Sequence, residues 1–127
     1  MLYSITSRKT LSEVGKDLET AAQKHKFGVL AVHDLKAKMK EKQVEFQRDC
    51  RIYEVCNADQ ARKVLEANVE ISTALPCRIS VYSHADGVVL ATLRPTAMIE
   101  MFHAPSLRTV AEEVEESIVA MMQEAAK

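Results

Sequence analysis

The chain contains no tryptophan, and only three glycines and three prolines among its 127 residues. So few glycines argue against a loop that cradles phosphate, and neither GxGxxG nor GxxxxGK[ST] occurs. Gly-x-Ser-x-Gly is also missing, so nothing supports an acyl-transfer serine. The shortage of both glycine and proline argues against long irregular stretches. We therefore expect a regular fold without the signatures of nucleotide binding or hydrolysis.

The chain also lacks an excess of either charge, because 17 basic and 18 acidic residues leave a net charge of −1. No global field attracts the chain to nucleic acid or to a membrane, and we expect neither as a partner. Its apolar runs are far shorter than the roughly 20 residues that span a bilayer. Residues 1–6 lack the basic start and apolar run of a secretory signal. Together with an odd number of cysteines, this predicts a cytoplasmic protein.

Metal-ligand spacing is absent as well. Zinc sites usually place cysteines roughly two to four residues apart, and none of the three cysteines is so placed. The four histidines form no i, i+4 pair with each other or with a cysteine. We expect no cofactor and no resident metal, and a transient metal at Cys56 and Cys77 stays open. What is abundant is apolar residues, 47% of the chain, enough to bury the core of a single domain spanning residues 1–127.

Hydrophobic spacing in the first third predicts two strand–helix pairs. Residues 2–6 alternate as a short strand, and Thr10-Leu11-Ser12-Glu13 is a capping box that begins a helix. Gly28 is expected to end this helix in a left-handed conformation. The continuous apolar run 29–33 predicts a buried strand, and Asp34 caps a second helix. The apolar side chains of that helix that we expect to point inward are Leu35 and Met39.

The middle of the chain predicts a strand, a short helix and a hairpin. Residues 50–56 form the strand, and Asn57-Ala58-Asp59-Gln60 is a second capping box. Its helix is expected to end near residue 68. Residues 77–82 alternate with period two, and Asp86-Gly87 is a tight-turn signal that returns the chain antiparallel over residues 88–93.

The last third predicts a short helix over residues 98–102 and a long helix over residues 107–122, whose apolar stripe is the best in the chain. Its methionines indicate core packing or, alternatively, a self-association face. All elements together predict an α+β fold. In this fold strand–helix–strand units form a mainly antiparallel sheet, with helices packed on it and a long amphipathic helix at the C-terminal end.

Two cysteines stand at the junctions of these elements. Cys56 precedes Asn57, the expected helix cap, so free amides and the helix dipole would favour the reactive thiolate. Cys77 follows Pro76, which cannot donate a hydrogen bond. If their strands are neighbours, the two sulfurs could lie close together. The alternative is that both cysteines pack as small hydrophobic residues, which we also expect of Cys50.

Four segments together resemble one known family, the bacterial and archaeal domain of unknown function family 302. They are Arg51-Ile52-Tyr53-Glu54-Val55-Cys56-Asn57, Ala74-Leu75-Pro76-Cys77-Arg78-Ile79, Asp86-Gly87-Val88 and Arg94-Pro95. The resemblance implies a compact α+β fold, usually as a homodimer. It also implies that the family's signature positions are Cys56, Asn57, Pro76, Cys77 and Arg78. Ala58 stands where a proline often follows the Cys-Asn pair, which leaves the helix start intact.

Two functions remain open, and they leave undecided whether the protein is an enzyme. The first is a thiol-bearing protein that binds a small ligand or handles sulfur, with a small molecule or a sulfur-transfer protein as partner. Cys56 would be the nucleophilic or carrier sulfur, Cys77 its resolving or co-ligating partner, and Arg78 an anchor for an anionic group, with Asn57 and Pro76 beside the ligand. The second is a non-catalytic homodimeric binding module in which both cysteines are structural. Its partner surface would be the last helix and the sheet.

Overall fold

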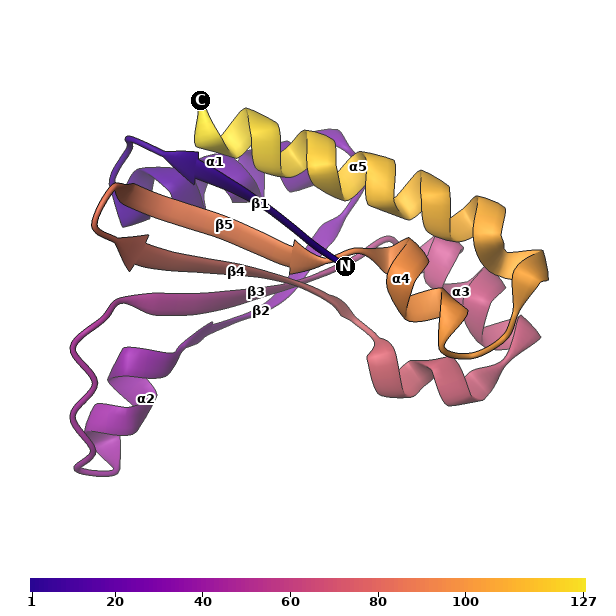
Figure 1. Ribbon diagram of the computed structural model, residues 1–127, viewed down its shortest axis with the longest axis horizontal. Helices are drawn as coiled ribbons and strands as arrows, with labels where there is room; N and C mark the ends of the chain where they lie inside the picture. The colour runs from indigo at the N-terminus through magenta and orange to yellow at the C-terminus, as the bar shows by residue number, and fades with distance from the viewer.

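The computed structural model describes residues 1–127 and contains one five-stranded antiparallel sheet in the order β1-β5-β4-β3-β2 (Figure 1). The strands are β1 (Leu2–Ser7), β2 (Gly28–Asp34), β3 (Cys50–Cys56), β4 (Cys77–His84) and β5 (Gly87–Leu93). The helices are α1 (Leu11–Lys24), α2 (Leu35–Glu41), α3 (Ala58–Ala67), α4 (Pro95–Glu100) and α5 (Arg108–Ala126), with 3-10 helices η1 (Val69–Ala74) and η2 (Pro105–Leu107). The α+β fold with a long C-terminal helix is confirmed. None of the helices combines the length and the apolar character needed to cross a bilayer.

The main core lies between one face of the sheet and the two long helices, α1 and α5, which run side by side over that face (Figure 1). Each large apolar side chain buried there contributes about 1.5–3 kcal/mol by leaving water. Met121 and Met122 of α5 are fully buried in this core. The methionine-lined self-association face considered for the last helix is therefore not available, because α5 uses that stripe to cover its own sheet. The other large, fully buried side chains are Leu18, Ile79, Leu90 and Ile118.

A second, smaller apolar cluster joins the short helices at one end of the sheet. It has five buried residues against sixteen in the main core, so far less apolar burial stabilises it. The cluster connects α3, η1, α4 and η2 to the first half of α5, at the right-hand end of the molecule in Figure 1. Its buried residues are Val64, Ile71, Ile99, Leu107 and Ala111.

β2 is an edge strand, whereas its apolar sequence predicted a buried one. Leu30 is 62% exposed and Val32 is 42% exposed, because the sheet ends at β2 and neither long helix covers them. A shift in the pairing with β3 around Leu30 marks a β-bulge. Asp34 caps α2 as expected, but this helix has no buried residue. The inward packing predicted for Leu35 and Met39 is confirmed only in part, because both are half-buried on a helix that projects away from the body of the molecule (Figure 1).

The helix caps show how far local sequence sets the element boundaries. The Thr10 capping box is complete, with the Thr10 hydroxyl accepting from the Glu13 amide at 3.2 Å and the Thr10 amide donating to the Glu13 carboxylate at 3.1 Å. The predicted stop at Gly28 is wrong. The helix ends at Lys24, Lys26 takes the left-handed conformation with φ of 64°, and Gly28 already begins β2.

The predicted hairpin is confirmed. β4 and β5 are antiparallel neighbours, and their pairing begins at His84 and Gly87. Gly87 has a φ of 138°, and a Cβ placed there would collide with the carbonyl oxygen of Ser7 in β1. Only glycine fits both the turn and this close approach of β1.

Candidate functional site

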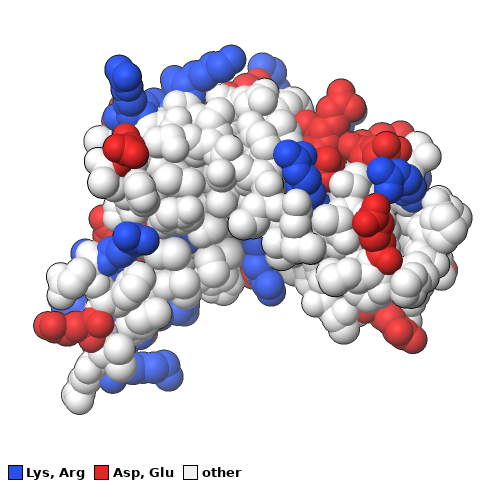
Figure 2. All heavy atoms as spheres, in the orientation of Figure 1, with Lys and Arg blue, Asp and Glu red and all other residues white.

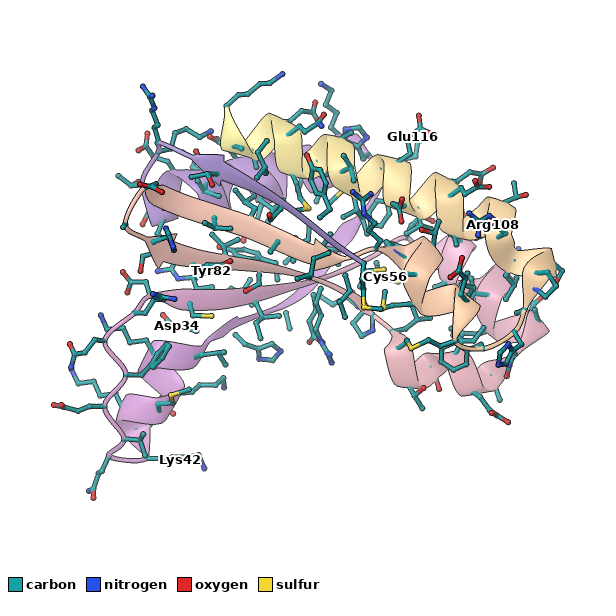
Figure 3. All side chains as sticks on the ribbon, viewed as in Figure 1. Asp34, Lys42, Cys56, Tyr82, Arg108 and Glu116 are labelled. Atoms are coloured by element: carbon teal, nitrogen blue, oxygen red, sulfur yellow. The ribbon has the colours of Figure 1, made fainter.

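The sheet brings the two signature cysteines to the same end of neighbouring strands. Cys77 of β4 pairs with Val55, the residue immediately before Cys56 in β3. Cys77 is buried on the helix-covered side, while Cys56 is half-buried where β3 leads into α3. Figure 3 labels Cys56 at this junction between the sheet and the small helical cluster. Cys50 lies half-buried at the other end of β3, and all three cysteines are free thiols.

Both thiols line one small cavity, here termed the thiol hollow. Its volume is about 40 Å³, which exceeds the roughly 10–15 Å³ that a single water needs. No charged residue lines it, and the polar groups on its wall come from the cysteines, Asn57 and Gln60. The apolar part of the wall consists of Phe27, Val55, Ala61, Val64, Leu75 and Val114.

Burial keeps both thiols in the neutral form. It raises the pKa of Cys56 above the ordinary 9.0, so the thiolate expected from the helix start is wrong for this site. Loss of water disfavours the charged thiolate there. Burial first, and the neighbouring charge of a Cys56 thiolate second, raises the pKa of Cys77 to about 11. Near neutral pH neither sulfur is an activated nucleophile.

Asn57 and Gln60 do not form the capping box that their sequence predicted. Asn57 does cap α3, because its Oδ1 accepts from the Gln60 amide at 3.1 Å. The Gln60 side chain instead reaches α5, where its Nε2 donates to the Glu113 carboxylate at 3.5 Å. A carboxylate can only accept, so this contact fixes the amide's orientation. The other end of the amide, Oε1, is buried without a hydrogen-bond partner.

Gln60 is the residue of this site that sequence reasoning missed. It lines the thiol hollow together with both cysteines, yet its sequence position suits a helix cap equally well. Its partner Glu113 lies 53 residues along the chain, so no local pattern could reveal the contact. The only signal in the sequence was that a glutamine side chain in the first turn of a helix can form its hydrogen bond outside that turn instead of capping the helix.

Arg78 lies on the opposite face of the sheet from Cys77, since adjacent residues of a strand point to opposite sides. Its side chain is 64% exposed, and its Nε lies 3.4 Å from the Glu54 carboxylate. His33 Nε2 lies 2.9 Å from the other Glu54 oxygen. Hydrogen bonds from His33 and then Arg78 hold the pKa of Glu54 below its ordinary value. Arg78 therefore does not line the thiol hollow, where it was expected to anchor an anion.

Pro76 also lies outside the thiol hollow. The Leu75–Pro76 peptide is cis, and Pro76 lines a separate shallow depression with Arg78, Leu93 and Met98. Of the five signature residues, the structure thus brings Cys56, Asn57 and Cys77 together and leaves Pro76 and Arg78 outside.

A second cavity, here termed the helix hollow, adjoins the first. Its volume is about 50 Å³, and eleven of its twelve lining residues are hydrophobic. Side chains of α4 and of the turn after it, among them Met98 and Phe102, form its outer wall. No charged residue lines it. The residues that line both hollows, and so form the partition, are Val64, Leu75, Cys77 and Val114.

No group of three or more histidine, cysteine, aspartate or glutamate side chains is arranged to hold a metal ion. The site therefore consists of two neutral thiols, one unpartnered amide oxygen and apolar walls. Such a set can contact an uncharged molecule.

Comparisons with known proteins agree with the resemblance found in the sequence. The family model described as "Domain of unknown function DUF302" matches residues 3–125. A crystal structure of an uncharacterized conserved protein DUF302 from Bacillus stearothermophilus is similar over 99% of this chain and 98% of that chain. The two share 27% sequence identity and superpose with a TM-score of 0.93. Among curated proteins, none matches the chain.

Proposed function

The chain belongs to the domain of unknown function family DUF302, and on that premise we propose that it binds a small, neutral, mainly apolar molecule in the thiol hollow. The observation that carries this proposal is the amide of Gln60, a residue that lines the hollow and whose buried Oε1 has no hydrogen-bond partner. A buried acceptor without a donor costs about 1–3 kcal/mol. If the Gln60 amide turns to present this oxygen to the hollow, a ligand with a single hydroxyl or N–H donor removes this cost and fills the cavity at the same time.

Cys56 and Cys77 contact the ligand in this proposal as neutral, polarisable groups. Their raised pKa values favour this role over that of a carrier or resolving sulfur, which needs the thiolate. Arg78 contributes no anion anchor here, because it lies across the sheet. We also propose a reducing cytosol as its compartment, because an odd number of cysteines suits it better than a disulfide framework does.

The test compares two isomeric probes, 1-propanol and ethyl methyl ether, which have the same atoms but differ in the hydroxyl donor. In amide NMR titrations we expect saturable shifts at Cys56, Gln60 and Val64. The alcohol should bind roughly fivefold more tightly, as one net hydrogen bond of about 1 kcal/mol predicts.

Substitution of Gln60 completes this test. Gln60→Leu should erase the preference for the alcohol, whereas the matched control Gln23→Leu, at an exposed position of α1, should keep it. The proposal is wrong if the natural chain shows no saturable response around the hollow. It is also wrong if Gln60→Leu retains the full preference for the alcohol.

A second function, self-association, is favoured by the face of the sheet that α1 and α5 leave uncovered (Figure 1). Leu2 is 65% exposed and its pairing partner Leu93 is 46% exposed on this face. Ile52 and Val89 lie half-buried on the same side. We propose that two copies pack through this face as a homodimer, since exposed apolar groups gain free energy by leaving water.

Sedimentation velocity tests the homodimer. The natural chain is expected at twice the monomer mass, and Ala91→Glu, near the middle of the uncovered face, should shift it to the monomer because it would place a charge inside the interface. Ala37→Glu, at an exposed position of α2, is the control and should leave the mass unchanged. A natural chain that sediments as a monomer at micromolar concentration contradicts the proposal.

A further inference from the structure

We propose that the ligand is an unbranched alkyl chain with a neutral, hydrogen-bond-donating head, and that its tail passes from the thiol hollow into the helix hollow. The inference rests on the proposed function and names its ligand class. Three features of the structure carry it: the shared partition between the two hollows, the absence of charge on their walls, and the small amount of burial that holds the second cluster together.

The partition consists of side chains alone. Val64, Leu75 and Val114 contribute apolar groups, and Cys77 contributes a neutral thiol, to the walls of both hollows. Rotation of one such side chain would open the partition between the cavities without any change in the backbone. With such a side chain turned aside, a linear molecule would extend from the thiol hollow, of about 40 Å³, into the helix hollow, of about 50 Å³.

The wall chemistry sets the nature of the head group. Gln60 Oε1 accepts a hydrogen bond and cannot donate one. A carboxylate or phosphate head would have no donor there other than the thiols, and no cation lines either hollow. Glu113, which holds the Gln60 amide, would repel such an anion. Figure 2 shows acidic side chains over the first half of α5, with basic side chains among them. The head is accordingly neutral, of the alcohol or primary amide class.

The helix hollow lies in the smaller of the two apolar clusters, in which only five residues are buried. Two of the helices that line it are short, with six residues each in η1 and α4. Regions with few buried apolar contacts open at lower free energy than a main core. Met98, on the outer wall, is an unbranched side chain that adapts to a changing cavity. These properties allow the second hollow to widen around a chain longer than its present volume admits.

The experiment is a chain-length series of 1-alkanols, from 1-propanol to 1-decanol, titrated into the full-length protein and followed by amide NMR. Beyond the length that fills the thiol hollow, affinity should rise about fourfold per methylene until the helix hollow is full, as burial of one methylene predicts. Shifts at Met98 and Phe102 should appear only with the longer alcohols. Alkanoates of equal length should bind at least tenfold more weakly, because their charge would be unpaired.

A plug variant locates the tail. Ala74 and Val110 line the helix hollow and not the thiol hollow. Ala74→Leu should abolish the gain with chain length and leave 1-propanol binding unchanged. Val110→Phe is a second variant that fills the helix hollow. The titrations use whichever of the two variants has a thermal melt closer to that of the natural chain. Ala37→Leu, at an exposed position of α2, is the control and should retain the length dependence.

The outcomes separate the two proposals. If 1-propanol binds but affinity is flat with chain length, or if the plugged chains keep the full length dependence, the alkyl-chain inference is overturned and the proposed function stands. If alkanoates bind as tightly as alcohols, the neutral head is overturned. If no alcohol of any length binds, the proposed function itself fails.

Discussion

Cys77 begins β4 and packs against the main core. The residue is only 8% exposed, so its thiol has lost most of its contact with water. The same strand end places it beside Cys56, one register position away. Position at an element boundary thus gives these residues their neighbours, while burial gives them their protonation state. At Cys56, desolvation raises the pKa of the thiol above 9.0.

Alkylation of the native protein is expected to label Cys77 most slowly of the three thiols. Because its pKa rises from 9.0 to about 11, its thiolate fraction near neutral pH falls roughly 100-fold, and the thiolate is the species that reacts. Iodoacetamide labelling followed by mass spectrometry of the peptides measures the three rates. In a denaturant the difference should vanish. Equal labelling of Cys77 and half-buried Cys50 in the native state would contradict the assignment.

The same shift predicts a loss of stability in alkali. The pKa of Cys77 is higher in the folded state than in the unfolded state. Its neutral thiol therefore contributes stability in full below pH 9, and this contribution is lost as the pH rises toward about 11. The loss should reach about 2–3 kcal/mol, at roughly 1.4 kcal/mol per pKa unit. Urea unfolding from pH 8 to 11 measures it. Cys77→Ala should be less stable at pH 8, but its free energy of unfolding should fall less between pH 8 and 11. The other groups that titrate in this range are common to both chains, so the difference reports on Cys77.

Among the elements, α3 connects the two cavities to the sheet. Asn57 caps this helix, Gln60 joins it to α5, and Val64 forms part of the partition. One turn of helix therefore combines a structural cap with candidate ligand contacts. A substitution at Asn57 changes the position of the other two residues as well as the cap itself.

Asn57→Ala is expected to destabilise the protein by about 1 kcal/mol, since it leaves an amide of the first turn without its acceptor. Asn57→Asp keeps an acceptor at the same place and should restore most of the stability. Chemical denaturation of the three chains gives the comparison. Should Asn57→Ala weaken 1-propanol binding while Asn57→Asp restores it, Asn57 acts by positioning α3 rather than by contacting the ligand.

Local signals in the sequence predicted the elements well. Period-two alternation marks β4 and β5, and complete or partial caps mark the starts of α1, α2 and α3. Apart from the end of α1, which was predicted at Gly28, the failures concern what each element packs against. A run such as Val29–His33 has the same composition at the edge of a sheet as at its centre, so its exposure could not be predicted. The Gln60–Glu113 contact, which defines the candidate site, depends on a docking of α3 on α5 that no local pattern encodes.

At the scale of the whole molecule, Glu124 near the end of α5 joins this helix to the end of α1. Its carboxylate lies 2.8 Å from Lys24 Nζ and 2.6 Å from His25 Nε2. Hydrogen bonds from Lys24 and then His25 lower the pKa of Glu124 below the ordinary 4.5. The pair of long helices that covers the sheet thus has an acid-sensitive connection at its exposed end.

A lowered carboxyl pKa contributes stability that is present above the ordinary value of 4.5 and is lost as the pH falls through the lower folded-state value. Thermal melts from pH 6 to pH 3 should therefore show a steeper decline for the natural chain than for Glu124→Gln. The two melting temperatures should approach each other at the acid end. Parallel curves would mean that the contact is fully screened by solvent.

The extra residue in β2 affects how readily copies of this chain can aggregate through the edge of their sheets. Leu30 interrupts the ladder of an otherwise straight outer strand, and the kink turns free amides and carbonyls out of line. A chain with Leu30 deleted would present an even row of unpaired groups beside Val29 and Val32. Such a row is a template for another strand, so we expect the deletion to make concentrated solutions of this protein more prone to fibrous growth.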